Sequence, residues 1–326
     1  YFYNVNNVPY ITTDNPWWNK SSYDELSIGK NAYLLMGDMC LSNYNLEAVF
    51  FNRDMVEDYD MEDPYMLAYE NDWTIDKLIE MTSGLYVDAD QSGDKSEGDQ
   101  YGFSSSYFHL DAFYSGSGLR LVEDDPEGIL KISDDFYSQK AIDLADKLGA
   151  WFKQGDCYVS RRGDSFDEDI PFQEGRCVFI QNRVYMADAQ YAGGTGPLRD
   201  VDWEFGILPT PLYTAEQEEY ITLLGNPISL WSVMNGAKDP QMSTAVIECM
   251  ASEAYRQVDP IFYETNLKLR YAPDERLAGM YDLVRDSISF DFLYIYKNIL
   301  ANGYFRHTLK YYNYLLLQVL LPFLQP

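Results

Sequence analysis

Short apolar segments alternate with amphipathic helical segments along this chain, and the alternation limits the folds that it can adopt. Residues 177–180 and 205–208 have the length and composition of buried strands. Between 141 and 152, apolar residues recur at helical spacing along one face. A further helix is expected after Asp239 and Pro240, a cap followed by a first-turn proline. Strands that alternate with helices of this length predict an α/β architecture.

Local signals place four more features. Strands are expected at 101–107 and 228–233, and a helix is expected to begin near Leu110. Thr74 is expected to cap a helix that leads into an acidic loop. In the helix after Pro240, the side chains expected to face inward are Val246, Ile247 and Met250.

Composition limits the class of partner. The chain has 326 residues with 46% apolar content, enough for two domains or two lobes. Because 52 acidic residues stand against 24 basic ones, the net charge of −28 opposes binding to nucleic acid or anionic membranes. Aromatic residues make up 16% of the chain, and tyrosine rings suit the faces of sugars, although most are expected to pack in the core.

Cysteine and histidine support little chemistry. The four cysteines form no C-x-x-C pair, which argues against a zinc site and leaves disulfide pairing open: Cys40, Cys157, Cys177 and Cys249. The two histidines stand in no catalytic motif. No secretion signal precedes Tyr1, so any signal is expected to be removed or to lie outside this chain. The apolar stretch at 314–324 is too short to span a bilayer and is expected to be a docked helix.

Residues 88–99 have the spacing of an EF-hand calcium loop, with Gly93 at the sharp turn. The predicted ligands of a structural Ca²⁺ are the side chains of Asp88, Asp90, Ser92 and Asp99 and the carbonyl of Asp94. Ser96 would act directly or through water. Asp99 stands where a longer Glu is usual and must reach further for a bidentate contact. An acidic surface loop without a metal is the alternative.

Several short segments follow one another along the chain in an order that is informative as a series. A Phe-Gln-Glu-Gly-Arg segment at 172–176 precedes the strand at 177–180 and the pair Asn182 and Arg183. An extended strand ends in Phe-Asn-Arg-Asp at 51–54, and 203–211 combines a strand with a proline turn. Further segments lie at 225–231, 239–240, 263–274 and 280–284. The series resembles the extracellular solute-binding proteins of ABC transporters, in the sugar-binding group of maltose-binding protein. The acidic loop before residue 101 is similar to that of members from gut Firmicutes.

This resemblance covers residues 15–300 and implies an α/β, two-lobed periplasmic-binding-protein type II fold with a ligand cleft between the lobes. Lobe one would comprise 1–47 and 259–309, lobe two 48–258, and 310–326 a terminal helix whose docking the resemblance does not define. The family begins with further strands of lobe one, so that lobe is expected to be incomplete at its N-terminus. Trp17 and Trp18 would pack in its core.

The resemblance also implies which side chains line the cleft. A sugar needs planar donors and acceptors for its hydroxyl groups and an aromatic face for its C–H surface. The expected ligand contacts are Tyr44, Asn45, Ser105, Tyr107, His109, Arg183, Tyr185, Asn226 and Trp231. A structural role is the alternative for five of them: the end of a strand for Tyr44 and Asn45, a satisfied core histidine for His109, a surface ion pair for Arg183 and core packing for Trp231.

The function that the resemblance implies is transport without chemical change. The protein would lie outside the cell, attached by a lipid anchor, and capture a carbohydrate, expected to be an oligosaccharide, as a monomer. It would deliver the sugar to the permease of an ABC importer, with Ca²⁺ supporting the strand that carries Ser105 and Tyr107. A glycoside hydrolase with two catalytic carboxylates is the alternative from another class, and a binding protein for a peptide or another solute is a third.

Overall fold

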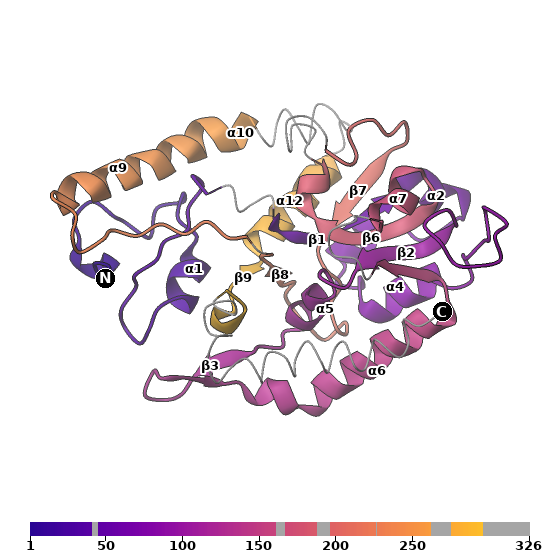
Figure 1. The fold of residues 1–326 in the computed structure, drawn as a ribbon, viewed down its shortest axis with the longest axis horizontal. Helices are drawn as coiled ribbons and strands as arrows, with labels where there is room; N and C mark the ends of the chain where they lie inside the picture. The colour runs from indigo at the N-terminus through magenta and orange to yellow at the C-terminus, as the bar shows by residue number, and fades with distance from the viewer. Residues whose placement is uncertain (41–44, 161–166, 188–195, 226, 262–274, 296–326) are drawn as a thin grey trace.

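The computed structural model describes residues 1–40, 45–160, 167–187, 196–225, 227–261 and 275–295. Five strands form a mixed sheet in the order β5-β2-β6-β1-β7 (Figure 1). Their bounds are β1 Glu47–Asn52, β2 Tyr101–Ser106, β5 Cys157–Ser160, β6 Cys177–Arg183 and β7 Phe205–Leu208. Strand β2 is parallel to β5 and β6, whereas β1 is antiparallel to β6 and β7. The carboxyl ends of β2, β5 and β6 therefore meet at one edge, beside the start of β1.

Two small sheets flank the large one. Strands β3 (Val122–Asp124) and β4 (Leu130–Ile132) pair antiparallel. Strands β8 (Thr222–Leu223) and β9 (Ile288–Ser289) pair parallel. The second pair joins segments that lie far apart in the sequence.

Helices cover both faces of the five-stranded sheet (Figure 1). On one face lie α2 and α7, and on the other lie α4, α5 and α6. Neighbouring residues of β2 point to these opposite faces. Ser104 bonds to the start of α7, whereas Phe103 packs against Trp151 of α6. The helix bounds are α1 Lys20–Glu25, α2 Arg53–Asp58, α3 Pro64–Tyr69, α4 Ile75–Thr82, α5 Asp111–Gly116, α6 Gln139–Gln154, α7 Asp169–Gln173, α9 Pro240–Glu253, α10 Asp259–Ile261 and α12 Glu275–Asp286. Short 3-10 helices span Val5–Asn7, Asp134–Tyr137 and Val184–Ala187, and a π-helical segment, Ala254–Val258, follows α9.

Local chemistry explains where the helices begin. Thr74 caps α4 by accepting the amide of Lys77 at 3.2 Å, as predicted. Asp239 caps α9 by accepting the amide of Met242 at 2.9 Å, and Pro240 occupies the first turn. The predicted strands at 101–107, 177–180 and 205–208 and the helix at 141–152 are confirmed.

Two local predictions are wrong. Residues 228–233 form no strand, since Trp231 makes only an isolated bridge with Leu35. In α9, Ile247 is buried as predicted, but Val246 is 50% exposed and Met250 is 39% exposed. This helix carries apolar residues on both sides, so their spacing does not identify the buried face.

Two clusters of buried apolar side chains form the interior. The larger surrounds the five-stranded sheet and includes Trp73, Trp151, Phe103 and Phe179. The smaller joins the N-terminal segment to α9 and comprises Val5, Trp18, Ala32, Leu35, Val233, Ile247 and Ala251. Core packing is thereby confirmed for Trp18, while Trp17 is half-buried.

The packing groups some segments differently from the lobes that the sequence suggests. Helix α9 packs with the N-terminal segment in the smaller cluster, whereas the predicted limits assign it to lobe two. Helix α12 packs against β7, and Arg276 pairs with Asp63 at 2.7 Å, whereas the predicted limits assign it to lobe one. The exact limits of the lobes stay a prediction.

Two findings bear on membrane and redox chemistry. Across the described ranges, no helix combines the length and apolar character needed to cross a bilayer. All four cysteines carry free thiols, of which those of Cys40 and Cys177 are buried. The apolar stretch at 314–324 lies outside the described residues.

Candidate functional site

The sheet changes from apolar to polar at the edge where β2, β5 and β6 end. Strand β2 ends in Ser104, Ser105 and Ser106, all of them buried. Strand β6 passes from apolar residues to Gln181 and Arg183 at the same edge. Ligands of α/β proteins bind at the carboxyl ends of parallel strands. This edge is therefore the first place to look for a site.

A buried carboxylate lies at the centre of the edge. Glu47, the first residue of β1, is 0% exposed and is the register partner of Arg183 on β6. Its Oε1 accepts from Nε of Arg183 at 3.1 Å, and Nδ1 of His109 lies 3.0 Å from Oε2. Nε2 of Gln181 donates to Oε2 at 3.4 Å. We call these four residues the Glu47 cluster.

Charge and hydrogen bonding keep Glu47 ionised. Burial alone would raise the pKa of this carboxyl, but His109 and Arg183 outweigh it and hold the pKa below its ordinary value. An ionised carboxylate only accepts hydrogen bonds, so Nδ1 of His109 carries the proton. The cluster is a preorganised polar wall in which the donors of His109 and Arg183 are fixed by one acceptor.

The backbone approaches this wall closely at Gly225. A Cβ at this position would lie 2.6 Å from Nε of Arg183 and 3.0 Å from Oε1 of Glu47, so only glycine fits. The amide of Gly225 donates to the carbonyl of Asn45 at 2.8 Å, and Nδ2 of Asn45 donates to the carbonyl of Pro227. Asn45 thus ties two chain segments together beside the cluster.

An aromatic pair follows β2 directly. The rings of Tyr107 and Phe108 have centroids 4.0 Å apart with an interplanar angle of 32°. Phe108 is 43% exposed, and the amide of Tyr107 donates to the carbonyl of Ser160 at 3.1 Å. The amide of His109 turns back to the carbonyl of Ser106 at 3.1 Å, which places the aromatic pair next to the Glu47 cluster. Aromatic faces in this position suit the C–H surface of a sugar.

The other predicted ligand contacts have different surroundings. Ser105 is fully buried, and its Oγ donates to the carbonyl of Gln181 at 3.1 Å, so this hydroxyl serves the sheet. Tyr185 is 6% exposed and belongs to the larger core cluster. Trp231 is half-buried and packs against both clusters. Tyr44 and Asn226 lie outside the described residues.

Sequence reasoning missed Glu47, Gln181 and Gly225. One signal was available, since Glu47 directly precedes the apolar run Ala-Val-Phe-Phe of a buried strand. A charged side chain at such a position is costly to bury unless it is paired, and therefore indicates a partner elsewhere in the chain.

A second polar group lies on the opposite face of the same edge, beneath α7. Oγ of Ser104 donates to the carbonyl of Glu168 at 2.6 Å. Nδ2 of Asn182 donates to Oδ1 of Asp169 at 2.6 Å. Glu168 and Asp169 are each 3% exposed, although both carry carboxyl groups. The edge therefore has polar chemistry on both faces.

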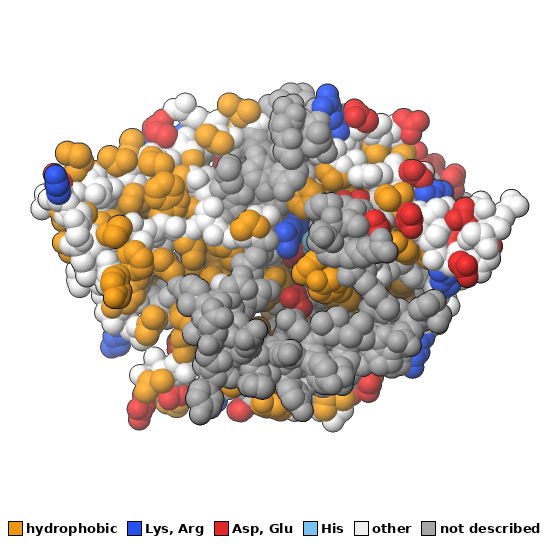
Figure 2. Space-filling view, in the orientation of Figure 1, with side chains coloured by type: hydrophobic (Ala, Val, Ile, Leu, Met, Phe, Trp, Pro, Cys, Tyr) orange, Lys and Arg blue, Asp and Glu red, His pale blue; other side chains and the backbone are white. Residues whose placement is uncertain are grey.

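The acidic loop between α4 and β2 gathers three carboxylates. Asp88, Asp90 and Asp99 each place an oxygen within 4.8 Å of the others. Asp99 is fully buried and accepts the amides of Ala89 and Ser96 at 3.0 and 3.1 Å. Hydrogen bonds from Ser96 and Ser92 lower the pKa of Asp90 to about 2. Figure 2 shows acidic side chains gathered at the right-hand end of this face, where Figure 1 places the loop.

The other two predicted ligands, Ser92 and Asp94, lie in the same loop, which hydrogen bonds hold to the rest of the chain. Oγ of Ser92 donates to the carbonyl of Asp94 at 2.9 Å, so the two face each other. Arg176 donates to the carbonyl of Asp99 at 2.6 Å. The hydroxyl of Tyr101 donates to the backbone carbonyl of Ser96 at 2.9 Å. These bonds join the loop to the start of β2, the strand that leads to the polar edge.

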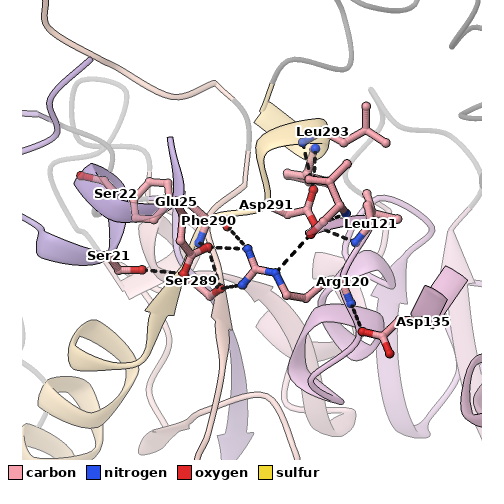
Figure 3. A network of polar contacts seen from close by, with 12 residues as sticks. Ser21, Ser22, Glu25, Arg120, Leu121, Asp135, Ser289, Phe290, Asp291 and Leu293 are labelled. Carbon is pink, nitrogen blue, oxygen red and sulfur yellow. Dashed lines mark hydrogen bonds and ion pairs between the residues drawn. The ribbon is translucent and has the colours of Figure 1, made fainter. Parts of the chain in front are cut away.

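A further network connects α1 to the segments around β3 and β9 (Figure 3). The guanidinium of Arg120 donates to Glu25 at 2.7 Å and to the carbonyl of Phe290 at 2.8 Å. Oδ2 of Asp291 accepts the amide of Leu121 at 2.6 Å. Glu25 ends α1, so this network holds three segments together that are far apart in the sequence.

Comparison with known proteins gives one kind of match. No family model and no curated protein matches this sequence. Among solved structures, an ABC substrate-binding protein from Listeria monocytogenes, Lmo0181 in complex with cycloalternan, is 12% identical with a TM-score of 0.55, over 94% of this chain and 74% of that one. A cyclo/maltodextrin-binding protein complexed with maltotetraose is 10% identical with a TM-score of 0.57, over 94% and 72%.

A third structure agrees with these two. The GacH receptor of Streptomyces glaucescens, solved unliganded and with acarbose, is 12% identical with a TM-score of 0.55, over 98% of this chain and 73% of that one. All three are named as binding proteins or receptors. At such identities the likeness concerns the fold, and the chain has the two-lobed, mixed α/β fold of ABC-transporter substrate-binding proteins, as the sequence predicted.

Proposed function

We propose that this protein captures a carbohydrate, an oligosaccharide by preference, and delivers it to the permease of an ABC importer without changing it. The observation that carries the proposal is the fold, which it shares with proteins solved with cycloalternan, maltotetraose and acarbose. The polar edge of the sheet supplies chemistry of the kind that sugar capture needs.

The Glu47 cluster and the aromatic pair would form one wall of the binding site. His109 and Arg183 offer fixed donors, while Glu47 holds them in place at 3.0 and 3.1 Å. Tyr107 and the partly exposed ring of Phe108 add an apolar face beside them. Sugars combine hydroxyl groups with an apolar C–H face, and this wall matches both.

The proposal extends to place and partners. The protein would act as a monomer outside the cell, attached to its surface by a lipid anchor, with the permease as its protein partner. The net charge of −28 is unfavourable for nucleic acid and for anionic lipid surfaces as partners.

Thermal unfolding against a panel of plant and host oligosaccharides tests this function, with each mixture also assayed for new reducing ends. A carbohydrate-binding protein gains melting temperature with one glycan and returns that glycan intact. Cleavage would favour the glycoside hydrolase instead. Stabilisation by peptides alone would assign a peptide or another solute as the ligand.

We further propose that the loop at 88–99 holds a structural Ca²⁺. The three converging carboxylates of Asp88, Asp90 and Asp99 are hard oxygen ligands, and Oδ1 of Asp88 is buried without a hydrogen-bond partner among the described residues. Ser92 and the carbonyl of Asp94 would complete the ligand set. A bound cation would stiffen the loop at the entry to β2 and support the polar edge indirectly.

A further inference from the structure

The end of α1 lies between two bodies of the chain. Tyr23 of α1 packs against the smaller apolar cluster, whereas Leu26, directly after the helix, is buried within the larger one. The predicted limits place α1 in lobe one and the β3–β4 hairpin in lobe two, and the two elements meet at the lower left of Figure 1. Under these limits, a movement of one lobe relative to the other acts on this contact.

One part of the contact is an ion pair that joins α1 to the segment before β3 (Figure 3). Nη2 of Arg120 donates to Oε2 of Glu25 at 2.7 Å, and the two side chains are 38% and 23% exposed. Both residues also bond to Phe290, directly after β9: Arg120 donates to its carbonyl at 2.8 Å, and Glu25 accepts its amide at 3.0 Å. Because both charges are partly exposed, water can solvate them when the pair separates.

The other part of the contact lies between two turns. Gly29 follows α1 in a tight turn, and Gly128 lies in the turn of the β3–β4 hairpin. A Cβ added to Gly29 would lie 3.8 Å from the carbonyl oxygen of Gly128, so the backbones of the two turns are in contact. Since neither glycine has a side chain that interlocks, this contact can open and form again. The neighbouring Ile28 and Ile129 are 54% and 58% exposed.

A carboxylate beside the ion pair has a different character. Asp291 is 9% exposed, and its Oδ2 accepts the amides of Leu121 and Val122 at 2.6 and 3.3 Å. Its Oδ1 accepts two amides of its own segment at 3.0 and 3.2 Å. Four backbone bonds to one buried group make a fixed joint between β3 and the segment after β9. The more exposed pair of Glu25 and Arg120 lies next to this joint.

We propose that the pair of Glu25 and Arg120 and the two touching turns form a latch between the lobes, which favours the closed form of the sugar site. The proposal rests on the carbohydrate capture proposed above. Two-lobed binding proteins close about a hinge, and a contact made in the closed form raises the apparent affinity for whatever that form binds. Arg120 is then a positioning residue, which acts on the sugar through closure.

A distance measured across the latch tests the proposal. Spin labels at Ile28→Cys and Ile129→Cys report this distance by pulsed EPR, in a chain whose exposed thiol is removed by Cys249→Ser. We expect the sugar-free protein to include longer distances than the protein saturated with glycan. Arg120→Ala should shift the sugar-free distribution further toward long distances. Distances that are unchanged by Arg120→Ala would overturn the latch.

Affinity provides a second readout, with the Kd measured by calorimetry for the glycan that most raises the melting temperature. Arg120→Ala and Glu25→Gln should each weaken binding by about three- to fivefold, as expected for a partly exposed ion pair. The double variant should bind no more weakly than Arg120→Ala, because both substitutions remove the same interaction. Arg53→Ala is the matched control, since it breaks a pair with Glu204 at 2.9 Å beside the five-stranded sheet. It should leave the EPR distances unchanged and change the Kd by less than about 1.5-fold.

The outcomes separate the latch from its basis. A Kd that is unaffected by Arg120→Ala, or effects of the two substitutions that add independently, would overturn the latch while carbohydrate capture stood. Absence of binding by any glycan would overturn carbohydrate capture. In that case the distances in the sugar-free protein still decide whether Glu25 and Arg120 hold the two segments together.

Discussion

Glu47 and Arg183 face each other across β1 and β6 as register partners, with Oε1 and Nε 3.1 Å apart and side-chain exposures of 0% and 19%. The pair joins the start of β1 to the end of β6 at the polar edge of the sheet. His109 joins it from the turn after β2, so one carboxylate connects three segments of the chain. The geometry of this edge therefore depends on a single acid.

Removal of that acid should be costly. Glu47→Gln leaves the guanidinium of Arg183 and the ring of His109 without their acceptor charge, and we expect the free energy of unfolding to fall by about 3 kcal/mol. Urea unfolding measures the change. The pKa of Glu47 is lowered in the folded state, so this contribution is present above its ordinary pKa of 4.5 and is lost as the pH falls through the folded value.

A surface pair provides the matched control for that variant. Glu204 bonds to Arg53 at 2.9 Å but is 60% exposed. Glu204→Gln should change the free energy of unfolding by less than about 0.5 kcal/mol. Equal effects of the two substitutions would contradict the role given to burial at Glu47.

The buried carboxyl of Asp169 predicts a dependence on pH of the opposite sign. Its pKa is raised from 3.8 to about 8, so the folded state binds more protons than the unfolded chain between these values. The contribution of this residue to the free energy of unfolding therefore falls as the pH rises through that interval. Unfolding in urea at pH 5 and at pH 8.5 should show a smaller difference for Asp169→Asn than for the wild type. Asp134→Asn, at an exposed side chain, should leave the difference unchanged.

The network around Arg120 predicts a stabilising role outside the site. Arg120→Ala removes the bonds to Glu25 and to the carbonyl of Phe290, and we expect a loss of about 1–2 kcal/mol in the free energy of unfolding. Arg120→Lys keeps the charge but not the forked geometry, so its free energy of unfolding should lie between those of the wild type and Arg120→Ala. Lys131→Ala, at an exposed ion pair, serves as the control. A loss no larger than that of the control would show that the network contributes little.

Removal of metal tests the calcium loop. EDTA should lower the melting temperature, and added Ca²⁺ should restore it. Asp88→Asn and Asp90→Asn each remove a proposed carboxylate ligand and should abolish this response. Asp94→Asn is the matched control, because Asp94 would contribute only its backbone carbonyl. A wild-type protein indifferent to both EDTA and Ca²⁺ would leave the loop as an acidic turn held by its own hydrogen bonds.

Local features of the fold were predictable from the sequence. The caps at Thr74 and Asp239 and the apolar strand at 177–180 depend on neighbouring residues only, and the structure confirms them. The order of the strands was not predictable, since β1 pairs with β6 and β7, more than a hundred residues away. The outward position of Val246 likewise depends on what α9 meets in space.

The site was predictable in part for the same reason. His109 follows β2 and Arg183 ends β6, so their positions at the edge could be expected, and the structure brings them together. Their common partner Glu47 is the first residue of β1, which runs antiparallel to β6. Only the register of the two strands shows that the start of β1 lies beside the end of β6. The hydroxyl of Ser105 donates to the carbonyl of Gln181 on β6, which only the pairing of the strands shows, whereas its residue type alone suggested a ligand contact.

Calorimetric titration of the wild type with the glycan that most raises its melting temperature tests the central claim most directly. Phe108→Ala should weaken binding by about tenfold through loss of the exposed ring, whereas Tyr137→Ala, at a ring 70% exposed elsewhere, should not. The account predicts one glycan bound per protein and its recovery intact after the titration. A glycan recovered as cleavage products, or binding indifferent to Phe108, would contradict it.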